Sequence, residues 1–343
     1  MKYVFHRVGS LNLTKRWNEE CIPVVDDWQD EDVQEIQFST GFKSYQVAVR
    51  LACWQDGDSR GRFYTPASGT PVWVDLPPYA VSDPEAFWAH MDAQLPDDAI
   101  EWASSCNLPE VSERRLVYCE LLRLIPVNSN AREMISQLIQ LEYCRWLKTG
   151  SANIVGGNKL GIAPVPEDAC TMPGKVPLPR LITAQIDILL SRKLEGLLND
   201  LFQSSEAFEL LSPTCGAFQL HTAYVVVDAL VRGTVWILKD MKRRREENSG
   251  AEELVKGINE EASEIQRSLN SIIFRLNQKL TCSQYEDMME LLTEKERTYH
   301  SQILAEPEGS PLGFKDEWEN PRFWLPPIKT MCEGIAPHQV FSL

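Results

Sequence analysis

The chain has 343 residues, of which 43% are hydrophobic and 24% are charged, and its formal net charge is -15 at pH 7. This hydrophobic content can bury a substantial core, which excludes a chain that is disordered throughout. The acidic balance lacks the excess of Lys and Arg that neutralises phosphates, and therefore argues against direct DNA binding.

The cysteines and the hydropathy of the chain bear on its compartment. Nine Cys are scattered without a C-x-x-C and without a Cys/His pair at metal-ligand spacing. An odd count with no disulfide framework indicates reduced thiols. No signal peptide is apparent, and no apolar run approaches the roughly 20 residues of a membrane span. We expect a protein of the nucleus or cytoplasm that has no membrane contact.

The first 80 residues are predicted to contain a small antiparallel β segment. Residues 33–76 alternate between apolar and polar side chains, and a turn-rich tract at 56–61 interrupts them. Two prolines at 77–78 then precede Ser82 and Asp83, either of which can cap a helix that begins at Pro84. The hydrophobic period becomes helical from this point.

Residues 81–149 are predicted to be helical, with helices at 84–95, 97–105, 110–125 and 129–149. Residues 150–179 contain five Gly and five Pro, which is typical of an irregular connection.

A helix bundle is predicted over 180–305, from helices at 180–204, 217–247, 251–280 and 283–304. Within it, residues 224–231 are nearly all apolar, which indicates a central helix covered on several sides. Residues 306–343 are rich in Pro and Trp and are expected to pack on the bundle as an extended tail. The predicted fold class is therefore mainly α, with a small N-terminal antiparallel β segment followed by a multi-helix bundle.

One acidic pattern suggests metal chemistry. Asp26, Asp27 and Asp30 have the D-D-x-x-D spacing that can hold magnesium diphosphate. A terpene-cyclase-like enzyme would need a second motif, and Asn199-Asp200 begins like one, but Gln203 and Ala207 occupy the positions of its remaining ligands. The competing interpretation is a solvated acidic turn, so we assign no metal site.

A basic run of four residues, Lys242, Arg243, Arg244 and Arg245, has two interpretations. It could act as a nuclear-localisation signal, because clustered positive charge at a helix end is accessible to acidic partners. Cations near a helix C-terminus also complement the helix dipole, which is the purely structural interpretation.

No pattern of residues predicts a catalytic site or a cofactor. The five His are dispersed, and neither a phosphate-binding loop nor a G-x-S-x-G occurs. The ten Trp could line a pocket for a small apolar effector, although such residues more commonly fill cores.

The middle of the chain carries a set of breaker residues in a fixed order. They are Gly156-Gly157-Asn158-Lys159-Leu160-Gly161-Ile162, Pro164-Val165, Gly174-Lys175-Val176-Pro177-Leu178-Pro179-Arg180 and Ala184-Gln185-Ile186-Asp187. This segment resembles the regulatory, middle-homology region of fungal binuclear zinc-cluster transcription factors, in which a CGxETLGM turn precedes a G-x-[IV]-P-x-P entry into a long helix. Val155 stands in place of the Cys of that turn, and Asn158-Lys159 replace its Glu-Thr.

The resemblance extends over about residues 15–325. Upstream it includes Arg16-Trp17, Asp27-Trp28, residues 36–41, Asp56-Gly57-Asp58 and residues 76–81, and downstream it includes Glu317-Trp318 and Phe323-Trp324. The DNA-binding unit of those proteins is an N-terminal run of six cysteines, whereas this chain has only Cys21 before residue 50.

The resemblance implies a transcription regulator that contacts protein partners, such as transcription factors or a second copy of itself, and not DNA. The alternative is an enzyme of a fungal secondary-metabolite pathway, such as the magnesium-dependent terpene-cyclase-like protein considered above. We expect the non-catalytic role.

Overall fold

The computed structural model describes residues 14–17, 22–67, 69–105, 113–128, 131–169, 171–203 and 217–249, together with seven single residues between 290 and 300. These single residues are 290, 291, 293, 294, 297, 299 and 300. The helix predicted at 251–280 and the tail predicted at 306–343 lie outside the described residues.

The chain divides into two compact units. Unit 1 comprises residues 1–98 and 143–196, and unit 2 comprises residues 99–142 and 197–343. Because the polypeptide passes from one unit to the other more than once, each unit is assembled from segments that are distant in sequence.

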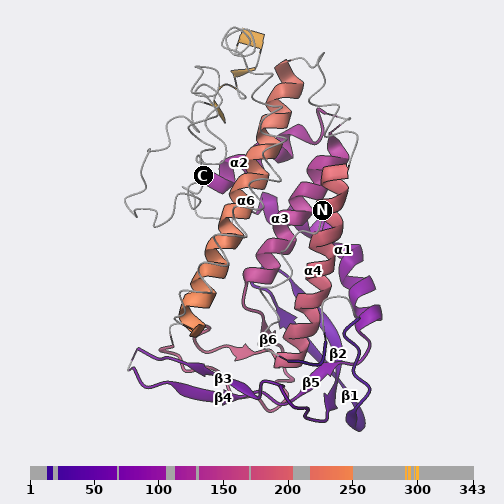
Figure 1. The fold of residues 1–343 in the computed structure, drawn as a ribbon, viewed down its shortest axis with the longest axis vertical. Coiled ribbons are helices and arrows are strands. Elements are labelled where there is room, and N and C mark those ends of the chain that lie inside the picture. The colour runs from indigo at the N-terminus through magenta and orange to yellow at the C-terminus, as the bar shows by residue number, and fades with distance from the viewer. Residues whose placement is uncertain are drawn as a thin grey trace. The chain divides into compact units, whose positions relative to one another are not determined.

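Unit 1 contains a five-stranded antiparallel sheet in the order β5-β2-β1-β6-β7. Figure 1 labels β1, β2, β5 and β6 of this sheet. Its strands are β1 (Trp28–Ser39), β2 (Ser44–Ala52), β5 (Tyr79–Val81), β6 (Asn153–Val155) and β7 (Val176–Pro177). The side chains of Ile36, Phe38, Tyr45, Val47 and Val49 are buried, while the residues between them are more exposed. This period of two confirms the alternation seen in the sequence.

A second, two-stranded sheet in unit 1 pairs β3 (Gly61–Tyr64) with β4 (Val72–Asp75) (Figure 1). The loop after β3 is joined to the segment before β7, since the Ala67 N–H donates to the carbonyl oxygen of Asp168 at 2.8 Å. The hairpin is thereby connected to the Gly/Pro-rich segment.

Five described helices complete the fold: α1 (Pro84–Ser104), α2 (Glu113–Leu124), α3 (Arg132–Thr149), α4 (Arg180–Gln203) and α6 (Ala217–Ser249). The carboxylate of Asp83 caps α1 by accepting a hydrogen bond from the Ala86 N–H at 2.9 Å. Pro96 lies inside α1, which continues through it as one helix where the sequence predicts two. The buried Leu95 and Ala99 on either side indicate that packing outweighs the lost backbone hydrogen bond.

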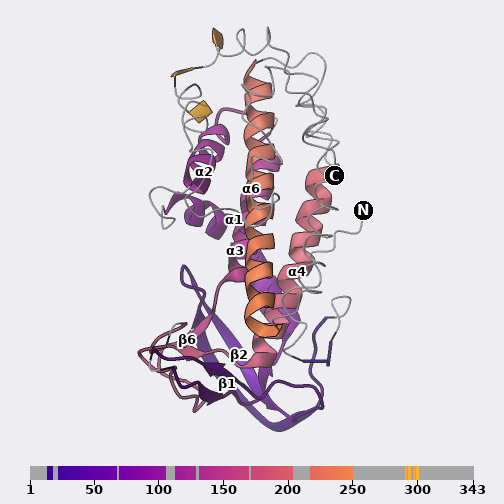
Figure 2. The same cartoon turned by 60° about the vertical axis from the view of Figure 1, so that its left-hand side comes forward.

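The core of unit 2 is built around α6. Residues 220–235 of this helix are all buried, which confirms the prediction of a helix covered on several sides. Helix α2 packs against it (Figure 2).

The predicted fold class is wrong. Five helices and seven strands are present among the described residues, so the protein is an α/β mixture with antiparallel sheets and not a mainly helical bundle. Part of the error lies in residues 150–179, where the sheet gains β6 and β7. Gly156 and Gly174 turn the chain with positive φ angles of 77° and 67°, and Pro177 lies on the edge strand, where a missing N–H is tolerated.

Among the described helices, none combines the length and the hydropathy needed to cross a membrane.

Two helical glycines provide a matched test of packing. A Cβ atom at Gly233 of α6 would overlap the carboxylate of Glu142, whereas a Cβ atom at Gly196 of α4 would meet nothing within 4 Å. We expect Gly233→Ala to lower the free energy of unfolding by about 1–3 kcal/mol through overpacking. The control Gly196→Ala should raise it by about 0.5–1 kcal/mol, because alanine favours helices. Urea denaturation measures both, and equal effects would contradict the packing of Glu142 against Gly233.

Candidate functional site

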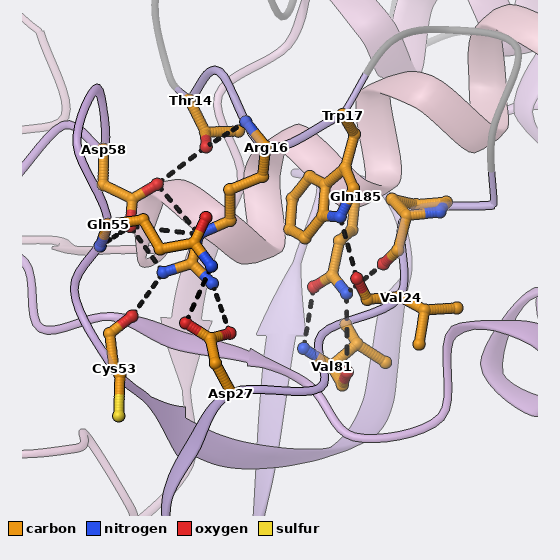
Figure 3. A network of polar contacts seen from close by, with 11 residues as sticks. Thr14, Arg16, Trp17, Val24, Asp27, Cys53, Gln55, Asp58, Val81 and Gln185 are labelled. Atoms are coloured by element: carbon orange, nitrogen blue, oxygen red, sulfur yellow. Dashed lines mark hydrogen bonds and ion pairs between the residues drawn. The ribbon is translucent and has the colours of Figure 1, made fainter.

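A network of polar contacts in unit 1 surrounds Arg16 (Figure 3). The Arg16 Nε atom donates to both carboxylate oxygens of Asp58 at 2.9 and 3.0 Å, and Nη2 donates to Oδ2 at 2.6 Å. Nη1 donates to Asp27 Oδ1 at 2.7 Å, and Nη2 also bonds the carbonyl oxygen of Cys53. We call Arg16, Asp27 and Asp58 the Arg16 clamp.

The clamp is largely closed to solvent. The side chain of Arg16 is 4% exposed, that of Asp58 is 0% exposed and that of Asp27 is 25% exposed. Each charge is therefore balanced inside the protein, which is the condition under which buried charges are tolerated.

Neighbouring donors hold Asp58 in its charged form. Its carboxylate accepts hydrogen bonds from Thr14 Oγ1 at 2.7 Å and from the Gln55 N–H at 3.0 Å. Burial acts to raise the pKa of Asp58, but the hydrogen bonds from Arg16, Gln55 and Thr14 outweigh it, and the pKa lies below its ordinary value. Gly57, with a φ of 94°, makes the tight turn that presents this carboxylate.

A second junction in unit 1 is formed by the fully buried amide of Gln185 on α4 (Figure 3). Its Oε1 atom accepts from the Val81 N–H at 2.8 Å, and its Nε2 atom donates to the Pro23 carbonyl oxygen at 2.8 Å. Trp17 is partly buried and packs against the neighbouring hydrophobic cluster, and its indole N–H donates to the Val24 carbonyl oxygen at 2.8 Å. Gln185 therefore ties the segment before β1, at Pro23, and β5 to α4.

Unit 2 contains a separate buried polar cluster. His221 of α6 bonds Glu120 of α2 through Nε2 at 2.7 Å and His300 through Nδ1 at 2.9 Å. Arg123 donates to both oxygens of Glu120 at 2.9 and 2.6 Å. Both imidazoles and Glu120 are buried. One imidazole nitrogen must donate and the other accept, so the bond between the two histidines is lost if both are protonated.

The residue beside His300 makes a parallel contact. The Tyr299 hydroxyl donates to Asp228 Oδ2 at 2.8 Å, and Arg232 donates to Oδ1 of the same carboxylate at 2.8 Å. Tyr299 and His300 thus each make a polar bond to α6, Tyr299 to Asp228 and His300 to His221.

These clusters are arranged for structural support. Arg16 donates hydrogen bonds to carboxylates and a backbone carbonyl of other segments, and Gln185 bonds backbone groups of other segments. Such contacts fix the positions of the segments that they join. Their arrangement supplies ion pairs and hydrogen bonds, and we assign no catalytic role to either.

Comparison with known families identifies the chain. The family model described as KpeA transcription factor matches residues 7–207. The chain belongs to this family. Comparisons with curated proteins and with solved structures gave no match.

Membership of the KpeA family agrees with the transcription-factor resemblance at the coarse level, since both indicate a role in transcription regulation. The resemblance is carried by residues that the fold brings together. Arg16, Asp27 and Asp58 form one clamp, and Gln185 of the Ala184–Asp187 motif joins the same part of unit 1. All of them lie within the part of the chain matched by the KpeA model.

The acidic residues considered as magnesium ligands are distributed as follows. Asp27 is a member of the Arg16 clamp, Asp26 is exposed, and Asp30 accepts a hydrogen bond from the Asp32 N–H at 3.1 Å. Asn199 and Asp200 lie in the last part of α4, within unit 2. In the described part of the chain, no group of three or more His, Cys, Asp or Glu side chains could hold a metal ion.

The basic run Lys242–Arg245 lies on the C-terminal part of α6. Lys242 is 6% exposed, so its charge is not freely presented. The side chains of Arg243, Arg244 and Arg245 lie outside the described ones.

The buried cluster of unit 2 was missed because its members are dispersed along the sequence. One signal was present: Asp228 interrupts the apolar run 224–231, and His221 lies seven residues before it. That spacing places them on one face of a helix, where they need polar partners. The identity of those partners could not be read from spacing.

The Arg16 clamp provides a stability test for this KpeA family member. Arg16→Met leaves two carboxylates without their cation and should lower the free energy of unfolding by about 3 kcal/mol. Adding Asp58→Asn to Arg16→Met should recover part of the loss, because the unpaired buried charge is removed. Urea denaturation of the single and double variants measures this coupling. Additive losses would contradict a direct ion pair.

The cluster of unit 2 predicts acid sensitivity. Hydrogen bonds from His221 and Arg123 outweigh burial and lower the pKa of Glu120 to about 2, while burial and the neighbouring His221 lower the pKa of His300 to about 3. Since both pKa values are lower in the folded state, stability is present above the ordinary values of 4.5 and 6.5 and is lost as the pH falls through these windows.

Replacement of His300 isolates its share of this effect. His300→Leu should weaken the protein at neutral pH and reduce the pH dependence between pH 6.5 and about 3 by up to about 1.4 kcal/mol per pH unit. His90→Gln, at an exposed histidine of α1, should leave the profile unchanged. Denaturation midpoints across this pH range provide the measurement, and an unaltered slope in His300→Leu would rule out the linkage.

Proposed function

We propose that this KpeA family member is a nuclear regulatory module that acts by binding other proteins and does not itself contact DNA. Its partners would be transcription factors or a second copy of the same chain. The matched region would correspond to the regulatory part of fungal zinc-cluster regulators, which the sequence resembles.

The observation that carries the proposal is the family match over residues 7–207, which contains the whole Arg16 clamp and Gln185. The polar side chains gathered there hold distant segments of unit 1 together. A region stabilised in this way is suited to presenting a fixed surface to another protein.

The charge of the chain supports the second part of the proposal. With a formal net charge of -15, this chain lacks the excess of positive charge that draws a protein to the phosphate backbone. Sequence-specific recognition without an electrostatic contribution from phosphate contacts is uncommon. Regulation through another DNA-bound protein avoids this difficulty.

A tethering experiment tests the regulatory role. The full chain is fused to a heterologous DNA-binding domain, and the expression of a reporter gene carrying that domain's operator is measured. We expect the fusion to change reporter expression relative to the domain alone. Arg16→Met should abolish the change because unit 1 loses its clamp, whereas Asp26→Asn, at an exposed neighbouring position, should retain it. A fusion that behaves like the domain alone would contradict the proposal.

The absence of direct DNA contact is tested separately with the purified full chain. Fluorescence anisotropy of random-sequence and promoter duplexes should show no sequence-dependent binding at physiological salt. Tight binding to one duplex, with competition by that sequence alone, would overturn this part of the proposal.

A further inference from the structure

Two arginines of unit 1 gather positive charge beside a buried tyrosine. The guanidinium of Arg62, on β3, lies 5.5 Å from the centre of the Tyr64 ring. Tyr64 is 2% exposed. Arg180, the first residue of α4, interacts electrostatically with both Arg62 and Tyr64. The β3–β4 hairpin and the start of α4 therefore bring two like charges together.

The structure provides no carboxylate partner for this pair among the described residues. The Nε atom of Arg180 is buried and has no hydrogen-bond partner. Arg180 is influenced by Asp187, but that residue lies almost two helical turns further along α4. Arg62 makes its described contact with the Tyr64 ring.

Arg16 and Arg180 differ in the partners that their guanidinium groups find. Arg16 is largely buried, and two carboxylates and a backbone carbonyl receive its hydrogen bonds. Arg180 is partly buried, and its Nε atom is a buried donor without a hydrogen-bond partner among the described residues, which is costly. Burial, and then the like charge of Arg62, lower the pKa of Arg180, in agreement with an unbalanced cation.

The backbone around Arg180 adds to the positive potential. Helix α4 is 24 residues long, begins at Arg180 and has no acidic residue in its first turn. The preceding residue is Pro179, which offers no side-chain acceptor to the first N–H groups of the helix. The positive end of the helix dipole therefore remains uncompensated next to the two guanidinium groups.

We propose that Arg62, Arg180 and the first turn of α4 form a binding site for the phosphate or carboxylate group of a small anionic ligand. A planar guanidinium can donate two parallel hydrogen bonds to either group, and the buried Nε atom of Arg180 would gain the acceptor that it lacks. The site is independent of the proposed function, because it rests on the geometry of unit 1 alone.

Thermal unfolding of the full chain tests the site, with sodium phosphate and sodium citrate as probes and sodium chloride at matched ionic strength as the reference. A ligand that binds only the folded state raises the melting temperature in a saturable manner. We expect such a rise with phosphate, with citrate or with both, and the probe that acts identifies the group recognised. A rise equal to that in chloride would overturn the proposal.

Three variants locate the effect. Arg180→Met and Arg62→Met should abolish the anion-dependent rise, whereas Arg60→Met should keep it. Arg60 is an exposed arginine two residues from Arg62, and its guanidinium lies over Trp54 at 5.0 Å. In chloride alone, Arg180→Met should be at least as stable as the native chain, because an uncompensated cation has been replaced by an apolar side chain.

A purely structural arginine would behave differently. If Arg180→Met lowered the melting temperature in chloride, or if the anion effect persisted in both Arg180→Met and Arg62→Met, the proposal would be wrong. Should Arg180→Met fail to fold, Arg62→Met still decides the question, since Arg62 is exposed and its replacement leaves the start of α4 intact.

Discussion

The ion pairs of Arg16 with Asp58 and Asp27 are the constraint on which the organisation of unit 1 most depends. They join a short segment near the chain start, the residue before β1 and the turn between β2 and β3. Arg16, Asp27 and Asp58 all lie outside the strands of the sheet. The buried amide of Gln185 supplements the clamp by linking α4 to the backbone of Pro23 and Val81. Desolvated charges are stabilising only when fully paired, so the clamp specifies one arrangement of these segments.

Unit 2 also contains buried polar groups that need partners, and these groups include titratable side chains. Its central helix α6 is buried along most of its described length, yet it carries His221 and Asp228 within the apolar surface. Glu120 of α2 and the adjacent pair Tyr299 and His300 satisfy these groups. Such bonds define which residues can lie against α6, and they make this packing dependent on pH because the pKa values of His300 and Glu120 are lowered in the folded state.

The chain belongs to the KpeA transcription factor family, and the buried polar contacts described above stabilise its fold. Its polar residues are used chiefly to fix segments relative to one another within each unit. Arg180 differs, because its buried Nε atom, like that of Arg50, has no hydrogen-bond partner among the described residues, and Arg62 places a second positive charge near Tyr64.

The sequence by itself determined the features that depend on local pattern. The alternation of β1 and β2, the start of α1 at Pro84 and the buried character of α6 all follow from hydrophobic period and capping chemistry. Tertiary structure alone decided that residues 153–155 and 176–177 become strands, because the ladder partners of these short segments are β1 and each other. It also decided that Arg16 meets Asp58 and that His221 meets Glu120 and His300, since partners separated by 42, 101 and 79 positions share no local signal. Long-range pairing of this kind depends on how the whole chain packs, which spacing along the sequence does not encode.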